Sequence, residues 1–246
     1  MILTPVFPTA APPIDLESVD ARRLITELYR PPREDWLRLN LIGSVSGSAT
    51  GSDGTSETLT NQVDRVILNV IRSFSDVVVV GAASVRAEGY FVPRNGALAI
   101  VSRSGDFSGH RIKDTSNRGA VLILCPAAVA ERVRETIGLA DVAIVAVPDE
   151  NGSLAADAIV TALRGRGYRS IVAEGGPGIA SQLVLGHVVD ELCLTTSPVL
   201  NGGRLPILGT TEFADVPLTL AQLLIDGSGF SYARWALEAP AVTAGD

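Results

Sequence analysis

The sequence has few of the residues that build disulfide scaffolds or metal centres. Its 246 residues include two cysteines and two histidines. Cys125 and Cys193 each lie in an apolar run, where a cysteine usually packs as a small core residue. His110 lies in a polar stretch and is expected to be exposed, whereas His187 follows a predicted helix whose end it can cap. Because no third ligand lies near either histidine, we predict no metal site, and the two thiols fit a reducing compartment.

The sequence also lacks a membrane-spanning run, a basic balance of charge and a nucleophile motif. No uninterrupted apolar run is long enough to span a bilayer, and the N-terminus, MILTPVFPTAAPP, is a poor signal peptide without lysine or arginine. The net charge of -7 argues against a nucleic-acid partner, because neutralising phosphates requires a basic face. No GxSxG motif occurs. We therefore expect a cytoplasmic protein with neither a membrane nor a nucleic-acid partner.

Apolar β-branched runs and helical stripes alternate through most of the chain. The clearest helix is predicted over 61–74, where the apolar residues follow helical spacing. The run VVVV at 77–80 comes directly after it and is typical of a strand buried on both faces, as in a parallel sheet. Similar strands are predicted at 36–42, 97–102, 121–125, 141–147 and 170–174, with further helices at 128–137, 155–166 and 179–185. This alternation predicts an α/β fold with a mostly parallel sheet and right-handed crossovers.

The two ends of the chain differ from this pattern. Four prolines punctuate the first 13 residues, and Pro31-Pro32 closes a short helical stretch at 18–29, so residues 1–35 are predicted to be a peripheral extension. Near the C-terminus, the apolar segments 218–226 and 230–238 are separated by Gly-Ser-Gly and predict an antiparallel hairpin that closes the edge of the sheet. Residues 36–246 are therefore expected to form one domain.

Three short segments follow predicted parallel strands and are therefore expected to share the edge of the sheet where those strands end. Ligands bind at this carboxyl edge in open α/β sheets. They are Gly81-Ala82-Ala83-Ser84-Val85, Ser102-Arg103-Ser104 and Glu174-Gly175-Gly176-Pro177-Gly178. Gly175 and Gly176 allow backbone amides to approach a ligand closely, and the following helix adds a positive dipole end, which suits a pyrophosphate. The alternative for each glycine segment is a plain turn between a strand and a helix.

Two further loops carry a possible function and a plainer alternative. Arg103 lies between two hydroxyl residues, a combination that can bind a phosphate monoester such as an adenosine 2′-phosphate and so select NADPH over NADH. The alternative is a solvated surface loop. The segment 43–59 is rich in serine, threonine and glycine, and is either a mobile loop or a lid over a substrate.

Six segments, taken together and in order, resemble the reductase domain of the riboflavin-synthesis pyrimidine deaminase/reductase. They are more similar still to stand-alone pyrimidine-reductase-like proteins of actinobacterial type. The segments are WLRLNLIGSVSG (36–47), DVVVVGAASVRAEGY (76–90), AIVSRSG (99–105), AEGGPGIASQLV (173–184), VVDELCLTTSPVLNGG (188–203) and DGSGFSYARW (226–235). No single segment is specific, but their order and content are.

The resemblance implies a dihydrofolate-reductase-like fold, NADPH as cofactor and a homodimer, for which DELCLTT (190–196) is a candidate contact. It implies reduction of the ribose of a 5-amino-6-ribosylaminouracil phosphate to a ribityl chain. Carried over residue by residue, the cofactor contacts would be Gly81, Ala82, Ser84, Val85, Ser102, Arg103, Glu174, Gly175, Gly176 and Pro177. The substrate side would be lined by Asn40, Ser44, Ser46 and Glu88.

The implied chemistry needs a cofactor that carries hydride and a protein group that supplies a proton. Glu88 is our candidate for this acid or for a substrate anchor, and its alternative is a surface carboxylate. The chain departs from typical members at Ser46, where they have aspartate, at Asn40, where riboflavin-pathway members have lysine, and at Glu88, where they have aspartate. A serine cannot replace a carboxylate as an anchor or proton donor.

These departures leave three hypotheses open. The first is reduction of the riboflavin pyrimidine intermediate. The second is reduction of dihydrofolate or another pterin-like heterocycle, and the third is an NADPH-binding sensor or interaction protein without catalysis. All three take a small-molecule ligand and keep the cofactor half of the site, whereas the substrate half is altered.

Overall fold

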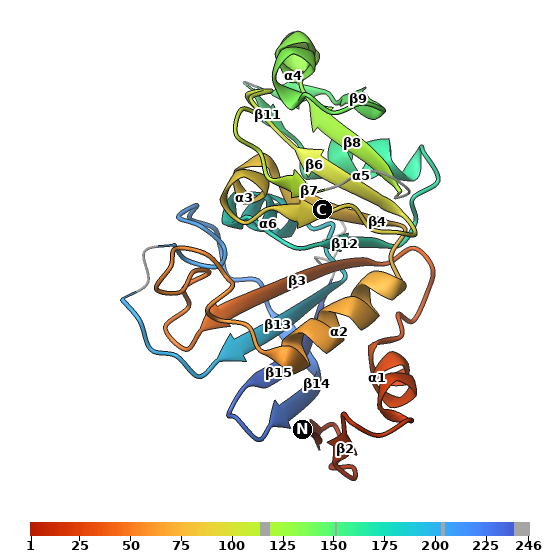
Figure 1. Cartoon of the computed structure of the whole chain (residues 1–246), viewed down its shortest axis with the longest axis vertical. Coiled ribbons are helices and arrows are strands. Elements are labelled where there is room, and N and C mark those ends of the chain that lie inside the picture. The colour runs from red at the N-terminus through yellow and green to blue at the C-terminus, as the bar shows by residue number, and fades with distance from the viewer. Residues whose placement is uncertain (114–118, 151, 203–204, 239–246) are drawn as a thin grey trace, which may run out of the picture.

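The computed structural model describes residues 1–113, 119–150, 152–202 and 205–238. Gly203, the last residue of one matching segment, and the end of the predicted domain at 239–246 lie outside the described residues. One sheet of eleven strands runs through the molecule, in the order β2-β1-β14-β15-β13-β3-β12-β4-β6-β8-β9 (Figure 1). Neighbouring strands from β13 to β9 are parallel, and those from β2 to β13 are antiparallel. The predicted α/β fold with a mostly parallel sheet and a C-terminal antiparallel hairpin is confirmed.

The strands predicted from apolar runs are present and bury both faces at the centre of the sheet. The parallel strands are β3 (Leu37–Ser44), β4 (Val77–Gly81), β6 (Ala97–Val101), β8 (Ala120–Cys125), β9 (Val142–Ala146), β12 (Ile171–Ala173) and β13 (Glu191–Ser197). In β4, Val78 and Val80 join one hydrophobic core, and Val77 and Val79 join the other. β9 differs from its expected double burial because it is the edge strand, and Ala143 and Ala146 on it are exposed.

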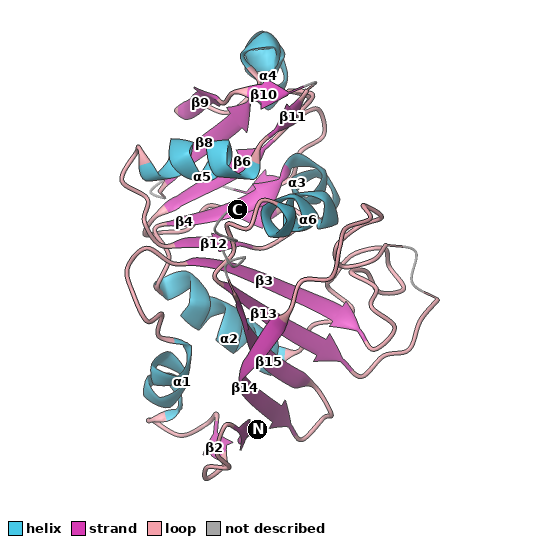
Figure 2. Ribbon diagram, turned by 180° about the vertical axis from the view of Figure 1, so that it is seen from behind, coloured by secondary structure: helices cyan, strands magenta, loops and turns pink. Residues whose placement is uncertain are grey.

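Helices cover the sheet on both faces. One core packs beneath α1 (Ala21–Tyr29), α2 (Gln62–Ser73), α3 (Ala82–Ala87) and α4 (Ala130–Ile137), which Figure 1 shows on the near side. The other core packs beneath α5 (Ala156–Arg164) and α6 (Pro177–Leu185), which Figure 2 shows from behind. Small elements complete the fold: β5 (Tyr90–Phe91), β7 (Ile112–Lys113), β10 (Asp149–Glu150), β11 (Ser153–Leu154) and the 3-10 turn Ala127–Val129. No helix of the described chain is long and apolar enough to cross a membrane.

The N-terminal residues belong to the same sheet and core, which differs from the peripheral extension expected. β1 (Ile2–Phe7) pairs with β14 (Leu218–Asp226) and with β2 (Ile14–Asp15). The predicted hairpin of β14 and β15 (Ser231–Leu237) therefore does not close the edge of the sheet, because β1 and β2 lie outside it. The prolines that punctuate this segment concealed a strand in which Pro5 itself pairs with Leu224.

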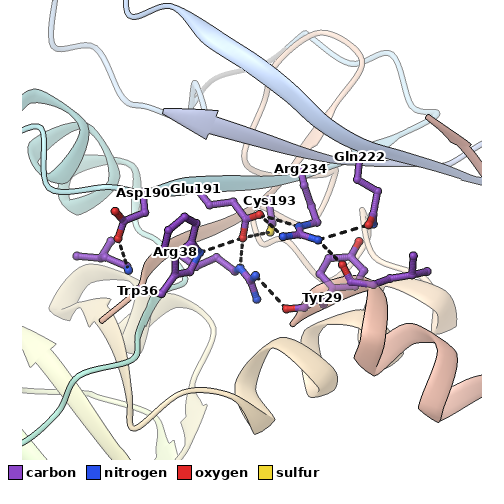
Figure 3. Close-up of polar contacts among 10 residues, drawn as sticks. Tyr29, Trp36, Arg38, Asp190, Glu191, Cys193, Gln222 and Arg234 are labelled. Carbon is purple, nitrogen blue, oxygen red and sulfur yellow. Dashed lines mark hydrogen bonds and ion pairs between the residues drawn. The ribbon is translucent and has the colours of Figure 1, made fainter. Parts of the chain in front are cut away.

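A buried ion cluster attaches α1 to the sheet (Figure 3). Arg38 on β3 donates to the Tyr29 carbonyl at 3.0 Å, and Arg234 on β15 donates to the Leu28 carbonyl, so two guanidiniums cap the last carbonyls of α1. Glu191 on β13 receives both cations, from Arg38 and from Arg234 Nε at 2.7 Å. Burial alone would raise the pKa of Glu191, but the two guanidiniums together lower it below its usual value. This cluster anchors α1 and leaves no group unpaired for a ligand among Arg38, Glu191 and Arg234.

Candidate active site at the carboxyl edge of the sheet

The turns after β4 and β12 are joined at the carboxyl edge of the sheet. β12 and β4 are neighbouring parallel strands, so the residues that follow them meet. The Gly81 amide donates to the Gly175 carbonyl at 2.9 Å, and the Gly176 amide donates to Ser84 Oγ at 2.9 Å. Sequence reasoning expected these amides to face a ligand, but two of them hold the turns together. The Ser84 hydroxyl still has its own proton to donate to a ligand.

The glycines at this junction are required by close approach and by backbone conformation. A Cβ on Gly176 would lie 2.7 Å from Ser84 Oγ, which is closer than a side chain tolerates. Gly175 has φ of +114°, a conformation that side chains rarely adopt. A Cβ added to Gly178, in contrast, would meet no atom of the described residues within 4 Å, so this position carries no such constraint. The Glu174-Gly-Gly-Pro-Gly segment is thus more constrained than a plain turn requires.

The third segment, after β6, presents Arg103 beside this junction. β6 lies next to β4 in the sheet. Ser102 is buried, and its Oγ accepts the Gly105 amide at 3.1 Å, so this hydroxyl shapes the loop. Arg103 is exposed, and no ion pair to it occurs within the described residues. The arrangement leaves its guanidinium available to an anion at this edge.

Sequence reasoning missed the partner of Glu174. Arg72, in the last turn of α2, forms a two-pronged ion pair with Glu174, with Nε 2.6 Å from Oε1 and Nη2 2.5 Å from Oε2. The Glu174 amide donates to the Val79 carbonyl at 3.0 Å, which continues the sheet by one residue. The Glu174 carboxylate is therefore occupied, and what it offers a ligand directly is its backbone and that of the turn it begins.

The serine-rich segment 43–59 is held by the connection between β13 and β14. Ser44 Oγ donates to Asn201 Oδ1 at 2.9 Å, and Ser46 Oγ donates to the Asn201 carbonyl at 2.6 Å. Asn201 Nδ2 donates to the Thr50 carbonyl at 2.9 Å. Asn201 was not predicted, although it lies within a segment that carries the family resemblance. Asn201 thus accepts the hydroxyl protons of Ser44 and Ser46, which stand where a typical member has Ser-x-Asp.

Glu88 binds the serine-rich segment 43–59 near its C-terminal end. It follows α3 directly, is half-buried, and its Oε1 accepts the Ser56 amide at 2.8 Å. Tyr90 lies close by, and its pKa is raised by burial first and then by the negative charges of Glu174 and Glu88. Glu88 is thus more than a surface carboxylate. Asn40 lies on β3 beside Cys193 of β13, half-buried and on the side of the sheet that faces α1 and α2.

Asp64 is the acidic residue of the site that sequence reasoning missed. It lies in the first turn of α2 and accepts hydroxyl protons from Thr60 at 2.6 Å and from Thr195 on β13 at 2.7 Å. Burial raises its pKa, against the opposing effect of the two hydroxyls, and the nearby charge of Glu174 adds to the rise. The signal for it was a carboxylate placed three residues before Ile67 and seven before Ile71, on the apolar face of a predicted helix.

The two histidines have structural roles. His110 is half-buried, in contrast to the exposure expected, because its Nε2 lies 2.7 Å from the Ile137 carbonyl and its Nδ1 accepts the Ile112 amide at 3.2 Å. His187 has φ of +51° directly after α6, in the position expected of a helix-end residue. In the part of the chain that the structure describes, no three histidine, cysteine, aspartate or glutamate side chains are grouped to hold a metal ion.

A groove of about 520 Å³ lies at the opposite, amino edge of the sheet, lined by 72–76, 95–96 and 166–168. Its hydroxyl and carboxylate groups serve the fold: Ser73 and Ser75 donate to carbonyls of α2, and Asp76 accepts the amides of Arg169 and Ser170. The carboxyl edge is the part of the molecule where hydroxyls, carboxylates and an uncommitted guanidinium gather beside constrained glycines. We therefore assign the candidate active site to the carboxyl edge.

Comparisons with known proteins relate the chain to a family and to solved structures. The model of the family described as RibD C-terminal domain matches residues 35–232. A search among curated proteins found no match. A pyrimidine reductase-like protein from Corynebacterium diphtheriae is similar in structure, with 23% identity and a TM-score of 0.74 over 87% of this chain and 98% of that chain.

Two more distant structures show the same fold. The Thermotoga maritima diaminohydroxyphosphoribosylaminopyrimidine deaminase/5-amino-6-(5-phosphoribosylamino)uracil reductase has 17% identity and a TM-score of 0.68 over 89% of this chain and 62% of its own. The riboflavin biosynthesis reductase Rib7 of Saccharomyces cerevisiae has 14% identity and a TM-score of 0.63 over 89% of this chain and 100% of its own. Because the family model spans more than half of the sequence, the chain belongs to the RibD C-terminal domain family, the riboflavin-biosynthesis pyrimidine reductases that its six segments resemble.

Proposed function

We propose that the chain is an NADPH-dependent reductase of a ribosylaminopyrimidine, with 5-amino-6-(5-phosphoribosylamino)uracil as the first candidate substrate. The observation that carries the proposal is the junction, at the carboxyl edge of neighbouring parallel strands, between the constrained Gly175-Gly176 turn and the start of α3, in a chain of this family. Backbone placed there without side chains suits close contact with a diphosphate.

The residues at this edge fit such a dinucleotide. The missing Cβ of Gly176 lets Ser84 approach the turn after β12, and the Ser84 hydroxyl keeps a proton to donate to a ligand. We propose that the Ser84 hydroxyl and the Ala82 amide, in the first turn of α3, contact the diphosphate from one side and that the Gly175 amide contacts it from the other. Gly81, Val85, Glu174, Gly176 and Pro177 would shape the two segments around it. Arg103, positioned by the loop that Ser102 shapes, would select the 2′-phosphate. When bound, NADPH supplies the hydride.

The protein's part in the reaction is to orient the substrate and to supply a proton. Asp64 is suited to hold a proton, because burial raises its pKa and two threonine hydroxyls fix its orientation. Glu88, which touches the serine-rich segment, is proposed as a substrate anchor or as a second acid. Asn40, Ser44 and Ser46 would complete the substrate side, with Asn201 fixing the two serines.

Asp64 also favours a second candidate, a pterin-like heterocycle such as dihydrofolate. A half-buried carboxylate with two oxygens can accept the paired N–H donors of an amino-substituted ring. Its position on α2 does not depend on the altered residues Ser46 and Asn40. The two candidates differ in the ligand group that they require, since the first needs a ribose phosphate and the second does not.

We further propose a cytoplasmic homodimer. The face of β13, β15 and β14 that points away from α1 and α2 carries Leu192, Leu194, Trp235, Leu220, Leu223 and Ile225, and Figure 2 shows no helix over it within the described chain. The residues of this face on β14 and β15 are uncharged, and Leu218 and Ile225 are exposed. A second copy would bury this apolar surface symmetrically. Light scattering on wild type and Ile225→Lys should show a dimer and a monomer, and a monomeric wild type would refute it.

One assay separates the functional candidates. Purified protein is mixed with NADPH and either the ribosylaminouracil phosphate or dihydrofolate, and the loss of nicotinamide absorbance is followed. We expect turnover with the first substrate. Turnover with dihydrofolate alone would favour the second candidate. Tight NADPH binding without turnover on either would leave the chain as a binding protein, and failure to bind NADPH would reject the proposal.

A further inference from the structure

The ion pair between Arg72 and Glu174 joins two parts of the chain that are 102 positions apart. Both guanidinium prongs are used, and the fork holds the carboxylate in one orientation. The Glu174 side chain is 5% exposed and that of Arg72 is 31% exposed, so the acid is buried and the base is partly open. Such a geometry fixes Glu174 rather than leaving it to solvent.

The position of Glu174 makes this pairing significant for an anionic ligand. The residue directly precedes Gly175, whose carbonyl accepts the Gly81 amide, and Gly176, whose amide donates to Ser84. A buried carboxylate therefore sits at the base of the turn that we assign to a diphosphate. Two like charges in a partly buried site repel each other strongly, because little water screens them. Without a counter-charge the acid would oppose the ligand.

We infer that Arg72 is a positioning residue of the dinucleotide site, which fixes Glu174 and cancels its charge so that the Gly175-Gly176 turn can accept a diphosphate. The inference rests on the proposed function, because it requires an anionic dinucleotide at this turn. It deepens that function by assigning a role to a residue on α2 that reaches the turn only through the Glu174 carboxylate. It also changes the role of Glu174, from a direct contact to a charge-neutral support.

Two other roles are distinguishable from this one. If the ion pair only ties α2 to β12, then breaking it from either side has the same effect on binding. If the Glu174 carboxylate contacts the cofactor directly, then its amide variant loses affinity. Charge compensation predicts instead that the two single variants behave differently and that removing both charges restores binding.

The test is a double-mutant cycle on the full chain, with NADPH affinity measured by fluorescence titration. We expect Arg72→Met to weaken NADPH binding roughly 30-fold, because it leaves one uncompensated negative charge at the base of the turn assigned to the diphosphate. Glu174→Gln removes the buried negative charge beside an intact Arg72 cation and should bind NADPH more tightly than wild type. The double variant should return to within about threefold of wild type, a limit near the non-additivity expected of pairs in contact. 2′-AMP, which lacks the diphosphate, should bind all four proteins with similar affinity.

Further variants and outcomes keep the inference open to refutation. Arg72→Lys retains the charge without the fork and should stay within about threefold of wild type. If Arg72→Met fails to fold, Glu174→Gln and Arg72→Lys still decide the point. A double variant as weak as Arg72→Met, or a Glu174→Gln variant weakened by tenfold or more, would overturn the inference while wild-type binding upheld the proposed function. A wild type that does not bind NADPH would overturn both.

Discussion

The two halves of the carboxyl edge are built from different kinds of contact. On the cofactor half, short turns directly follow β4, β6 and β12, and the turns after β4 and β12 are joined by the hydrogen bonds of Gly81 and Gly176. On the substrate half, the contacts join distant parts of the chain: Ser44 meets Asn201, and Asp64 meets Thr195. The cofactor half therefore rests mainly on backbone conformation, with Ser84 and the Arg72–Glu174 ion pair as its side-chain contacts. The substrate half rests on side chains that can be exchanged singly.

This difference matches where the sequence departs from its family. Gly176 cannot gain a Cβ unless Ser84 moves, and the φ of Gly175 is one that side chains rarely adopt. Serine fits at position 46 because its hydroxyl donates to the Asn201 carbonyl and accepts the Asn201 amide. We infer that a fold of this kind keeps its cofactor while its substrate changes. The following experiments test that contrast, from the largest expected effect to the smallest.

Replacing Asp64 by asparagine should lower kcat and leave cofactor binding unchanged. Asparagine cannot supply the proton, so we expect kcat to fall by about 100-fold or more, the usual contribution of a general acid. The affinity for NADPH should remain within about threefold, since Asp64 does not touch the glycine turns. Stopped-flow turnover and NADPH titration measure the two quantities. Asp157→Asn is the matched control, because Asp157 also lies in the first turn of a helix, on the opposite face of the sheet.

Replacing Gly176 by alanine should lower the affinity for NADPH. The new Cβ would lie 2.7 Å from Ser84 Oγ, so the turn and the hydroxyl must move apart, and we expect the displaced turn to lose roughly tenfold to a hundredfold in NADPH affinity. Gly178→Ala is the control, since no atom of the described chain lies within 4 Å of its added Cβ. Equal affinities for both variants, measured by titration, would show that the diphosphate does not approach this turn.

Replacing Arg103 by alanine should separate the two nicotinamide cofactors. If Arg103 holds the 2′-phosphate, NADPH should lose about tenfold to a hundredfold in affinity, from a charge-assisted contact of roughly 1.5–3 kcal/mol, while NADH changes little. Arg134→Ala, which removes an exposed arginine paired with Glu131, is the control. Similar losses for NADPH and NADH would assign Arg103 to the loop instead.

Asp64→Asn should also stabilise the fold, which is the smallest effect. Burial raises the folded-state pKa of Asp64 above 3.8, so its contribution to stability is present below that value and is lost as the pH rises through the raised pKa. The variant avoids this loss, and should unfold at a higher temperature at pH 7–8, by about 1 kcal/mol or roughly 2–4 °C. Calorimetry should show the difference shrinking as the pH falls toward 4. A variant less stable than wild type at pH 8 would contradict the burial argument.

Much of this architecture could be predicted because it depends on residues that lie close together in the sequence. The valine run of β4 and the apolar stripe of α2, capped by Asn61, need no distant partner to be recognised. The same holds for the glycine turns. β1 could not be predicted, because its pairing with β14 spans the whole chain and its prolines imitate a loop. Arg72 and Asn201 were missed for the same reason, since each acts through a residue more than 100 positions away.

A crystal structure of the protein soaked with NADPH would show directly whether the carboxyl edge binds the cofactor. We expect the diphosphate to lie against Gly175, Gly176 and Ser84, with the 2′-phosphate at Arg103. A dinucleotide bound instead in the groove at the amino edge, between 72–76 and 166–168, would contradict it.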